Sequence, residues 1–387
     1  MNAADSPLAL YVHWPFCVSK CPYCDFNSHV REGVDQAAWR TALLADLAHE
    51  AALLPGRRLG SIFFGGGTPS LMPPDTVAAV IDAAVAAWAP EPDIEITLEA
   101  NPSSVEAARF GDIARAGVNR VSLGLQALDD EALHFLGRAH DQAEGLAALG
   151  VAQRAFARVS FDLIYARPGQ PIADWEAELV RALSFGTGHL SLYQLTIEPG
   201  TRFATEVAKG RLSIPDADSA ADLFETTRAI TAAAGIPAYE ISNHARAGEE
   251  SRHNLAYWRY RDYAGVGPGA HGRRLGMATF RRKKPENWLA AVTRNAHGIE
   301  SEEALAPAVQ AQEALLMGLR LAEGVNLAAI AARAGKPIDA IVDTRAIATI
   351  PDLIRREGDR LIVTDAGMLL LDAILPRVVR AVDAVPA

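Results

Sequence analysis

The chain has 387 residues, more than one hydrophobic core usually supports, so we expect a large domain and a smaller one. Half of the residues are hydrophobic and 22% are charged, a balance that excludes a disordered chain. The formal net charge of −10 argues against a nucleic-acid partner, because it repels a phosphate backbone.

The N-terminal segment Met1–Pro7 lacks the basic and apolar regions of a signal peptide, and no stretch of the chain combines bilayer length with an absence of charges and helix breakers. The chain has three cysteines, all between Cys17 and Cys24. An odd, clustered set is not what a secreted disulfide framework would contain. We therefore expect a soluble, cytoplasmic protein.

Short apolar runs alternate with longer Ala- and Leu-rich segments of helical period over about the first 240 residues. The runs predicted as strands are Leu8–Trp14, Ser61–Phe64, Ile94–Glu99, Arg120–Gly124, Val159–Ile164 and Leu190–Leu195. Between them lie predicted crossover helices, among them Gln36–Leu54, Pro74–Trp88, Val105–Ala116 and Ala173–Phe185. This alternation predicts an α/β fold, a partial (β/α)6 barrel of the TIM type, with functional groups at the strand ends. A doubly wound sheet alternates in the same way, so both topologies stay open.

From about Leu305 the sequence changes to helices without intervening strands, followed by a short hairpin over Leu353–Val363 and a closing helix. That order is typical of a winged-helix module, although no basic recognition helix supports a DNA role. The three predicted helices are Ala308–Leu321, Leu327–Arg333 and Ile338–Asp343, and the closing helix is Asp365–Leu375. We predict a barrel over residues 1–240, a connecting segment over 241–304 and a winged-helix-like domain over 305–387.

The cysteines Cys17, Cys21 and Cys24 have spacings of three and two, so one loop can fold their thiolates around one metal centre. A structural zinc site needs four ligands, and His13 or His29 is near enough in the sequence to complete one. An iron–sulfur cluster held by three cysteines instead leaves one iron open to another ligand.

Polar and glycine residues follow several of the predicted strands. Phe64–Ser70 contains three consecutive glycines, which let a backbone approach a ligand closely. Glu99, Gln126 and Asp162 lie at or near the ends of later strands, and Arg138 would add a charge-assisted donor. Each residue alone is better explained as a cap, a turn or a surface group, but their joint placement on successive strands favours a ligand site.

The C-x3-C-x2-C pattern after a first strand resembles the cluster motif of the radical S-adenosylmethionine (SAM) superfamily. The resemblance implies a [4Fe–4S] cluster on Cys17, Cys21 and Cys24, with SAM bound at the open iron. Tyr11–Cys17 and Ser122–Gln126 further resemble oxygen-independent coproporphyrinogen III oxidase and its relatives. Carried over by motif, the SAM contacts of that family fall on Tyr11, Tyr23, Gly66, Gly67, Thr68, Glu99, Gln126, Arg138 and Asp162.

Two departures favour the HemW heme chaperones over the oxidases themselves. The oxidases carry a further cysteine where this chain has Phe26, and they have a longer arm before the cluster. The H-N-x-x-Y-W sequence at His253–Trp258 also resembles HemW, which implies that His253 binds heme, with His244 as a second candidate. The implied function is binding of heme and its delivery to respiratory apo-proteins at the cytoplasmic membrane face. Oxidative decarboxylation of coproporphyrinogen III is the alternative.

Two further features have open interpretations. The loop Gly265–Gly272 has few side chains, and it either borders SAM or a porphyrin or simply forms a turn that closes the barrel. The cationic run Arg281–Lys284 meets a propionate, an anionic lipid surface or only water.

Overall fold

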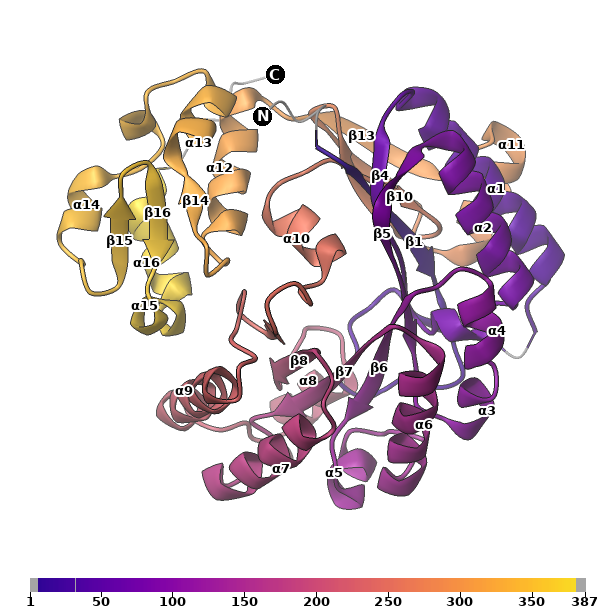
Figure 1. Cartoon of the computed structure of the whole chain (residues 1–387), viewed down its shortest axis with the longest axis horizontal. Helices are drawn as coiled ribbons and strands as arrows, with labels where there is room; N and C mark the ends of the chain where they lie inside the picture. Colours follow the sequence, from indigo (N-terminus) through magenta and orange to yellow (C-terminus); the bar gives the residue numbers. More distant parts are fainter. Residues whose placement is uncertain (1–5, 32, 381–387) are drawn as a thin grey trace.

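A computed structural model describes residues 6–31 and 33–380. Met1–Asp5 of the N-terminal segment and the last seven residues of the predicted C-terminal domain lie outside this range. Within it, one curved 11-stranded sheet dominates the molecule, in the order β13-β12-β11-β10-β1-β4-β5-β6-β7-β8-β9 (Figure 1). The strands are β1 (Leu8–Trp14), β4 (Arg58–Gly66), β5 (Ala89–Ala100), β6 (Arg120–Gln126), β7 (Arg158–Tyr165), β8 (His189–Gln194), β9 (Asn243–Ala245), β10 (Tyr263–Val266), β11 (His271–Arg274), β12 (Met277–Arg281) and β13 (Ile299–Ala304).

The strands β1 and β4 to β8 are parallel and follow one another in chain order. Every predicted run lies within one of these strands except for Leu195, and β4 and β5 extend beyond the predicted bounds. Because the order never reverses between β1 and β8, the doubly wound alternative is wrong. The sheet ends at β9 on one side and β13 on the other. The predicted partial β/α barrel is therefore confirmed.

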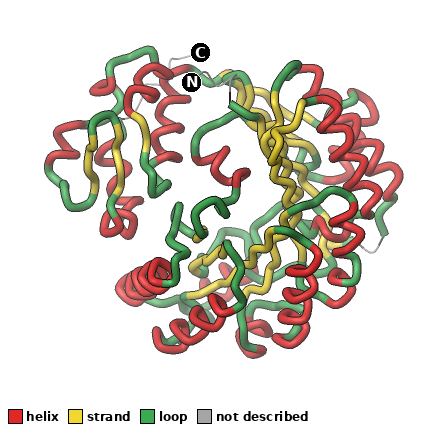
Figure 2. The backbone as a smooth tube through the Cα atoms, in the orientation of Figure 1, coloured by secondary structure: helices red, strands yellow, loops and turns green. Residues whose placement is uncertain are grey.

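Most of the helices cover the convex face of this sheet (Figure 2). They are α1 (Gln36–Leu53), α2 (Pro74–Ala87), α3 (Ser104–Ala107), α4 (Phe110–Arg115), α5 (Asp130–Phe135), α6 (Gln142–Ala155), α7 (Ile172–Ser184), α9 (Ala217–Ala233) and α11 (Pro285–Asn295). The short helix α8 (Arg202–Ala208) instead contacts the loop after β1, where the Phe203 N–H donates to the Pro22 carbonyl. The single helix predicted over Val105–Ala116 is instead two, and Glu106 of the first accepts hydrogen bonds from Ser70 and the Asn101 N–H.

The segment 241–304, expected as a connection, adds strands to both edges of the sheet. Strand β9 pairs with β8, and β10 pairs in parallel with β1 and leads into the antiparallel strands β11 to β13. The short helix α10 (Arg252–Trp258) lies on the concave side of the sheet (Figure 1). Buried Arg281 of β12 ties this edge to α1 through Asp46, at 2.7 Å.

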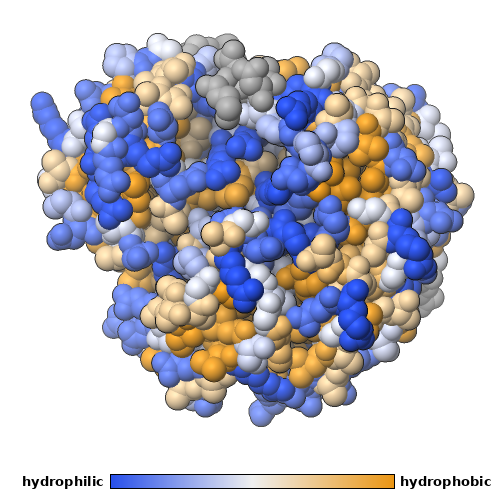
Figure 3. Space-filling view, viewed as in Figure 1, coloured by the Kyte–Doolittle hydropathy of each residue, from blue (hydrophilic) through white to orange (hydrophobic). Residues whose placement is uncertain are grey.

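The C-terminal domain has its own core of aliphatic side chains. Its elements are α12 (Pro307–Gly318), β14 (Val325–Asn326), α13 (Leu327–Ala334), α14 (Thr344–Ala348), β15 (Ile354–Glu357), β16 (Arg360–Val363), α15 (Asp365–Leu369) and α16 (Leu371–Val378). The predicted hairpin is β15–β16, whereas Ile338–Asp343 forms only a 3-10 turn over Ile338–Ala340, because Asp343 caps the next helix. Hydrophilic side chains cover much of the visible face of this domain (Figure 3).

Candidate functional site

The three cysteines lie on the loop that follows β1. Cys17 ends the short strand β2 (Phe16–Cys17), which pairs with β3 (His29–Val30) and so closes the loop at its base. Cys17, Cys21 and Cys24 are half-buried and line one cavity of about 420 Å³ at the carboxyl ends of the parallel strands. Three soft sulfur donors around one space fit an iron–sulfur cluster.

Hydrogen-bond donors lie beside two of the cysteine sulfurs. Thr68 Oγ1 donates to Cys17 Sγ at 3.5 Å, and Arg138 Nη1 donates to Cys21 Sγ at 3.2 Å. Burial raises the pKa of the Cys17 thiol, so a bound metal must displace its proton. His13 and His29 line a neighbouring cavity rather than this one, so the structure does not bring them to the cysteines as ligands for zinc.

The glycine turn after β4 forms the wall opposite Cys17. Gly66 has a φ of 116°, which a residue with a side chain rarely adopts. A Cβ atom on Gly67 would lie 3.0 Å from Cys17 Sγ and 2.8 Å from the carbonyl oxygen of Phe16. Glycine is therefore required here because the turn and the cysteine loop touch.

Two carboxyl groups form the floor of the cavity. Burial, together with the nearby carboxyl group of Asp162, raises the pKa of Glu99 to about 8. Burial also raises the pKa of Asp162 to about 6, although Ser122 donates a hydrogen bond to it at 3.3 Å. The Gly66 N–H donates to Glu99 Oε2 at 3.1 Å. Such groups can accept hydrogen bonds from an amine or a ribose, and a cationic ligand would favour their ionised form.

Residues beyond the end of β6 complete the wall. Gln126 has a φ of 71°, a strained conformation for a residue other than glycine. Arg138 donates to Asn101 Oδ1 at 2.6 Å and to the Gly124 carbonyl at 2.9 Å, so its guanidinium is fixed against Cys21.

The structure brings most of the predicted SAM residues together with the cysteines, while Tyr11 lines the neighbouring cavity instead. The cavity holds Tyr23, Gly66, Gly67, Thr68, Glu99, Gln126, Arg138 and Asp162. Sequence reasoning missed Asn101, Ser122 and His140, which line the same space. Ser122 begins the Ser122–Gln126 motif, and Asn101 and His140 each lie two residues after a predicted site residue, so this proximity in the sequence was the available signal. Binding of SAM by these residues stays a prediction.

His253 lies in α10 and is 1% exposed. Its Nδ1 shares a hydrogen bond with Ser61 Oγ at 3.0 Å, and its Nε2 shares one with Tyr257 Oη at 2.7 Å. The ring stacks on Phe63, and burial lowers the pKa of His253 to about 3. In this arrangement neither ring nitrogen has a free lone pair directed at solvent, so iron could bind only after one of these bonds breaks.

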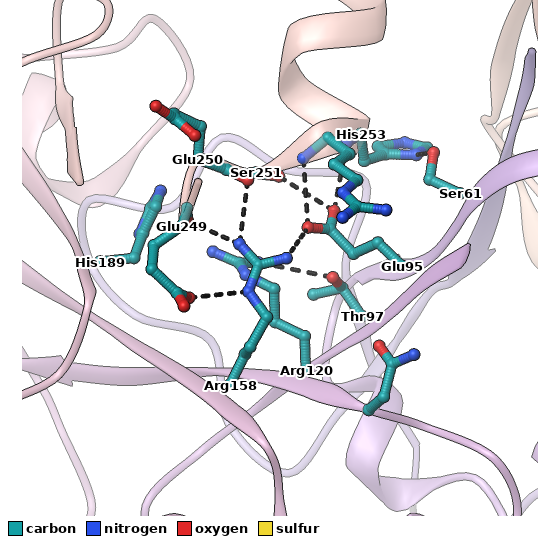
Figure 4. A network of polar contacts seen from close by, with 12 residues as sticks. Ser61, Glu95, Thr97, Arg120, Arg158, His189, Glu249, Glu250, Ser251 and His253 are labelled. Atoms are coloured by element: carbon teal, nitrogen blue, oxygen red, sulfur yellow. Dashed lines mark hydrogen bonds and ion pairs between the residues drawn. The ribbon is translucent and has the colours of Figure 1, made fainter. Parts of the chain in front are cut away.

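A buried polar network fixes the start of α10 against β5 (Figure 4). Glu95 accepts hydrogen bonds from the backbone N–H groups of Arg252 and His253, both at 3.1 Å, and from Arg158 Nη1 at 2.7 Å. Arg158 also pairs with Glu249 at 2.8 Å. The position of the H-N-x-x-Y-W sequence is therefore set by a charge cluster inside the barrel.

His244, the second heme candidate, lies in β9 and is buried. Neither of its ring nitrogens has a hydrogen-bond partner within the described residues. Burial, with the positive charge of Arg228, lowers the pKa of His244 to about 3, so the ring is neutral.

The glycine-rich loop and the cationic run lie beside the cysteine loop. Gly265–Gly272 comprises the end of β10, the turn Gly267–Ala270 and the start of β11, and Asn27 Nδ2 donates to the Pro268 carbonyl at 2.9 Å. Arg281 of the cationic run is buried, whereas Lys283 and Lys284 are exposed. The loop thus closes a hairpin and also borders the cavity that contains Tyr11.

A loop of three cysteines at the mouth of a partial β/α barrel, with a glycine turn and the half-buried carboxyl group of Glu99 facing it, defines a radical SAM protein. The model of the "Radical SAM superfamily" matches residues 11–181, and that of the "HemN C-terminal domain" matches residues 305–370. The solved coproporphyrinogen III oxidase (HemN) from Escherichia coli has a TM-score of 0.79 and 22% identity, and the match covers 96% of this chain and 89% of that one. This likeness concerns the fold alone.

Curated relatives narrow the family. The chain is 42% identical to the heme chaperone HemW of Escherichia coli K12, over 75% of this chain and 74% of that protein. It is 43% identical to the mitochondrial radical S-adenosyl methionine domain-containing protein 1 of Bos taurus, over 82% and 74% respectively. The chain belongs to the HemW family of radical SAM proteins. No helix among the described residues is long and apolar enough to cross a bilayer.

Proposed function

We propose that this protein is a radical SAM heme chaperone that binds heme and transfers it to respiratory apo-proteins. The observation that carries the proposal is the 42% identity to the heme chaperone HemW. Phe26 supports it, because the oxidase branch has a further cysteine at this position and the side chain here is 61% exposed beside the cysteine loop.

Within this proposal, Cys17, Cys21 and Cys24 hold a [4Fe–4S] cluster whose open iron binds SAM. When bound, the pair supplies one-electron reduction of the sulfonium. Gly66 and Gly67 give the nucleotide access to backbone N–H and C=O groups, and the floor carboxylates accept its polar hydrogens. The other proposed contacts are Tyr11, Tyr23, Thr68, Gln126 and Arg138.

The decisive experiment uses anaerobically reconstituted protein. Hemin is titrated in and followed at the Soret band, and the loaded protein is mixed with the heme-free form of a respiratory heme protein. We expect stoichiometric binding and faster heme acquisition than from free hemin at the same concentration. Incubation with coproporphyrinogen III, SAM and reductant should give no protoporphyrinogen IX. Sustained formation of that product would instead establish the dehydrogenase alternative.

The sequence predicts His253 as the axial ligand of heme, with His244 second, and this prediction can be tested directly. Because Tyr257 Oη lies 2.7 Å from His253 Nε2, iron binding requires this bond to open. If the sequence prediction for His253 is right, His253→Ala abolishes the ligand signature of the Soret band, and Tyr257→Phe strengthens hemin binding by freeing the nitrogen. Unchanged hemin binding by both variants would remove His253 from the heme site.

We also propose that transfer takes place at the cytoplasmic membrane face. Lys283 and Lys284 are exposed and adjacent, as contact with anionic lipid requires. Co-sedimentation with phosphatidylglycerol vesicles, compared with phosphatidylcholine vesicles, measures this contact. Equal recovery with both lipids would exclude an electrostatic membrane contact.

A further inference from the structure

A second cavity, of about 710 Å³, opens beside the cysteine loop. Its walls come from the ends of β1 and β10, from the cysteine loop and from the loop before β11. It shares Gly66, Glu99, Phe26, Ser28 and Lys20 with the first cavity, so the two spaces are adjacent. Its volume lies within the range of pockets that bury small ligands and cofactors.

Three histidines line this second cavity, and two of them form hydrogen bonds with Asn27. His13 Nδ1 shares a hydrogen bond with Tyr11 Oη at 2.9 Å, and its Nε2 lies 3.0 Å from the Asn27 carbonyl oxygen. His29 Nε2 lies 3.2 Å from Asn27 Oδ1. Because both ring nitrogens of buried His13 are bonded, it has none to offer a ligand.

The third, His271, is different. It is exposed at the start of β11, and neither ring nitrogen forms a hydrogen bond with any described residue. Its ring packs edge-on against Phe280 at 4.6 Å, which limits its orientation. Burial on one side, with Lys283 nearby, lowers the pKa of His271, and a neutral imidazole is the form that binds metal.

The remaining lining combines aromatic faces with two lysines, beside the carboxyl groups of Asp25 and Glu99. Phe26 is exposed at the border of both cavities, and Tyr257 and Tyr263 pack edge to face at 4.4 Å. Aromatic side chains of this kind can cover a porphyrin ring. Lys20 and Lys283 are exposed cations on the rim, where they can pair with carboxylates.

On the basis of the proposed heme-binding function, we propose that heme lies in this second cavity, with His271 as its axial ligand and Lys283 beside a propionate. The glycine-rich loop, the cationic run and Phe26 each contribute residues to the lining of this site. It places the cargo next to the SAM cavity, since Gly66 and Glu99 belong to both.

The test is hemin titration of the reconstituted full chain, with the Soret band and low-temperature EPR as readouts. His271→Gly should bind hemin at least tenfold more weakly and lose the signature of nitrogen ligation, and added imidazole should restore that signature. His134→Gly, an exposed histidine outside this cavity, is the matched control. Lys283→Glu should weaken binding several-fold, whereas Lys284→Glu, whose side chain does not line the cavity, should not.

The outcomes separate the two proposals. If the wild-type protein shows no histidine-ligated hemin, the heme-chaperone proposal itself fails. If the wild-type protein binds hemin and His271→Gly gives the same affinity and spectrum, our assignment is wrong, and loss of the signature in His253→Ala alone would move the ligand to α10. Because His271 is exposed, its replacement should leave the circular dichroism spectrum and the iron content of the cluster unchanged.

Discussion

Replacing Glu95 by glutamine tests the buried network behind α10. The Glu95 side chain is 1% exposed and pairs with Arg158 at 2.7 Å while it accepts two backbone N–H groups. Glutamine keeps the shape but removes the charge. Removing the charge of one partner of a buried ion pair lowers the free energy of unfolding by about 3–5 kcal/mol. Because Arg158 retains Glu249 as a partner, we expect the lower end of that range, about 3 kcal/mol.

The matched control is Glu91→Gln, on the same strand. Glu91 pairs with Arg58, whose side chain is 61% exposed, and such surface pairs contribute about 0–1 kcal/mol. Guanidinium-induced unfolding of both variants, followed by tryptophan fluorescence, measures the difference. If the two substitutions shift the midpoint equally, the Glu95 network does not fix α10 as we argue.

The pH dependence gives an independent check of the same network. Burial would raise the pKa of Glu95, but Arg120, Arg158 and the N–H groups of Arg252 and His253 outweigh it and lower the pKa. The stabilisation is therefore complete above the ordinary glutamate value of about 4.3 and is lost as the pH falls through the lowered value. The difference in the free energy of unfolding between the wild-type protein and Glu95→Gln should decrease only in that acidic range.

Three further predictions concern the cluster cavity. Gly67→Ala places a methyl group 3.0 Å from Cys17 Sγ, so iron content after reconstitution should fall below half of the wild-type value, while Gly111→Ala, on an open helix surface, should load normally. Arg138→Gln should weaken SAM binding about tenfold in equilibrium dialysis, because a charge-assisted donor is lost; unchanged affinity would exclude it as a contact. Since the pKa of Glu99 is raised to about 8, apo-protein stability should decline as the pH rises from the ordinary glutamate value to about 8, and thermal melts of Glu99→Gln should lack that decline.

The parallel strands of the barrel were predictable because strands buried on both faces read as short apolar runs. The antiparallel strands β11 to β13 were not predictable in this way. Strand β13 carries the sequence Ile-Glu-Ser-Glu-Glu-Ala and is largely exposed, so its pairing with β12 has no apolar signature. Such an edge is specified by long-range hydrogen bonding to β12, which local patterns do not contain.

The candidate site likewise combines features that a local motif reveals with features that depend on long-range contacts. Cys17, Cys21 and Cys24 lie within eight positions, so a local motif located the cluster. The surroundings of His253 depend instead on Ser61 and Glu95, which are 192 and 158 residues away in the chain. No spacing rule reveals that its nitrogens are already bonded, nor that His271 faces a cavity formed by the cysteine loop.

Asn27, three residues beyond the last cluster cysteine, connects the cysteine loop to the opposite wall of the second cavity. Its amide nitrogen donates to the carbonyl oxygens of Pro268 and Lys283, at 2.9 and 3.0 Å, and its oxygens lie within bonding distance of His13 and His29. The cysteine loop and the opposite wall of the second cavity are therefore joined through one side chain. A change in the position of the cysteine loop should accordingly alter the shape of that cavity as well.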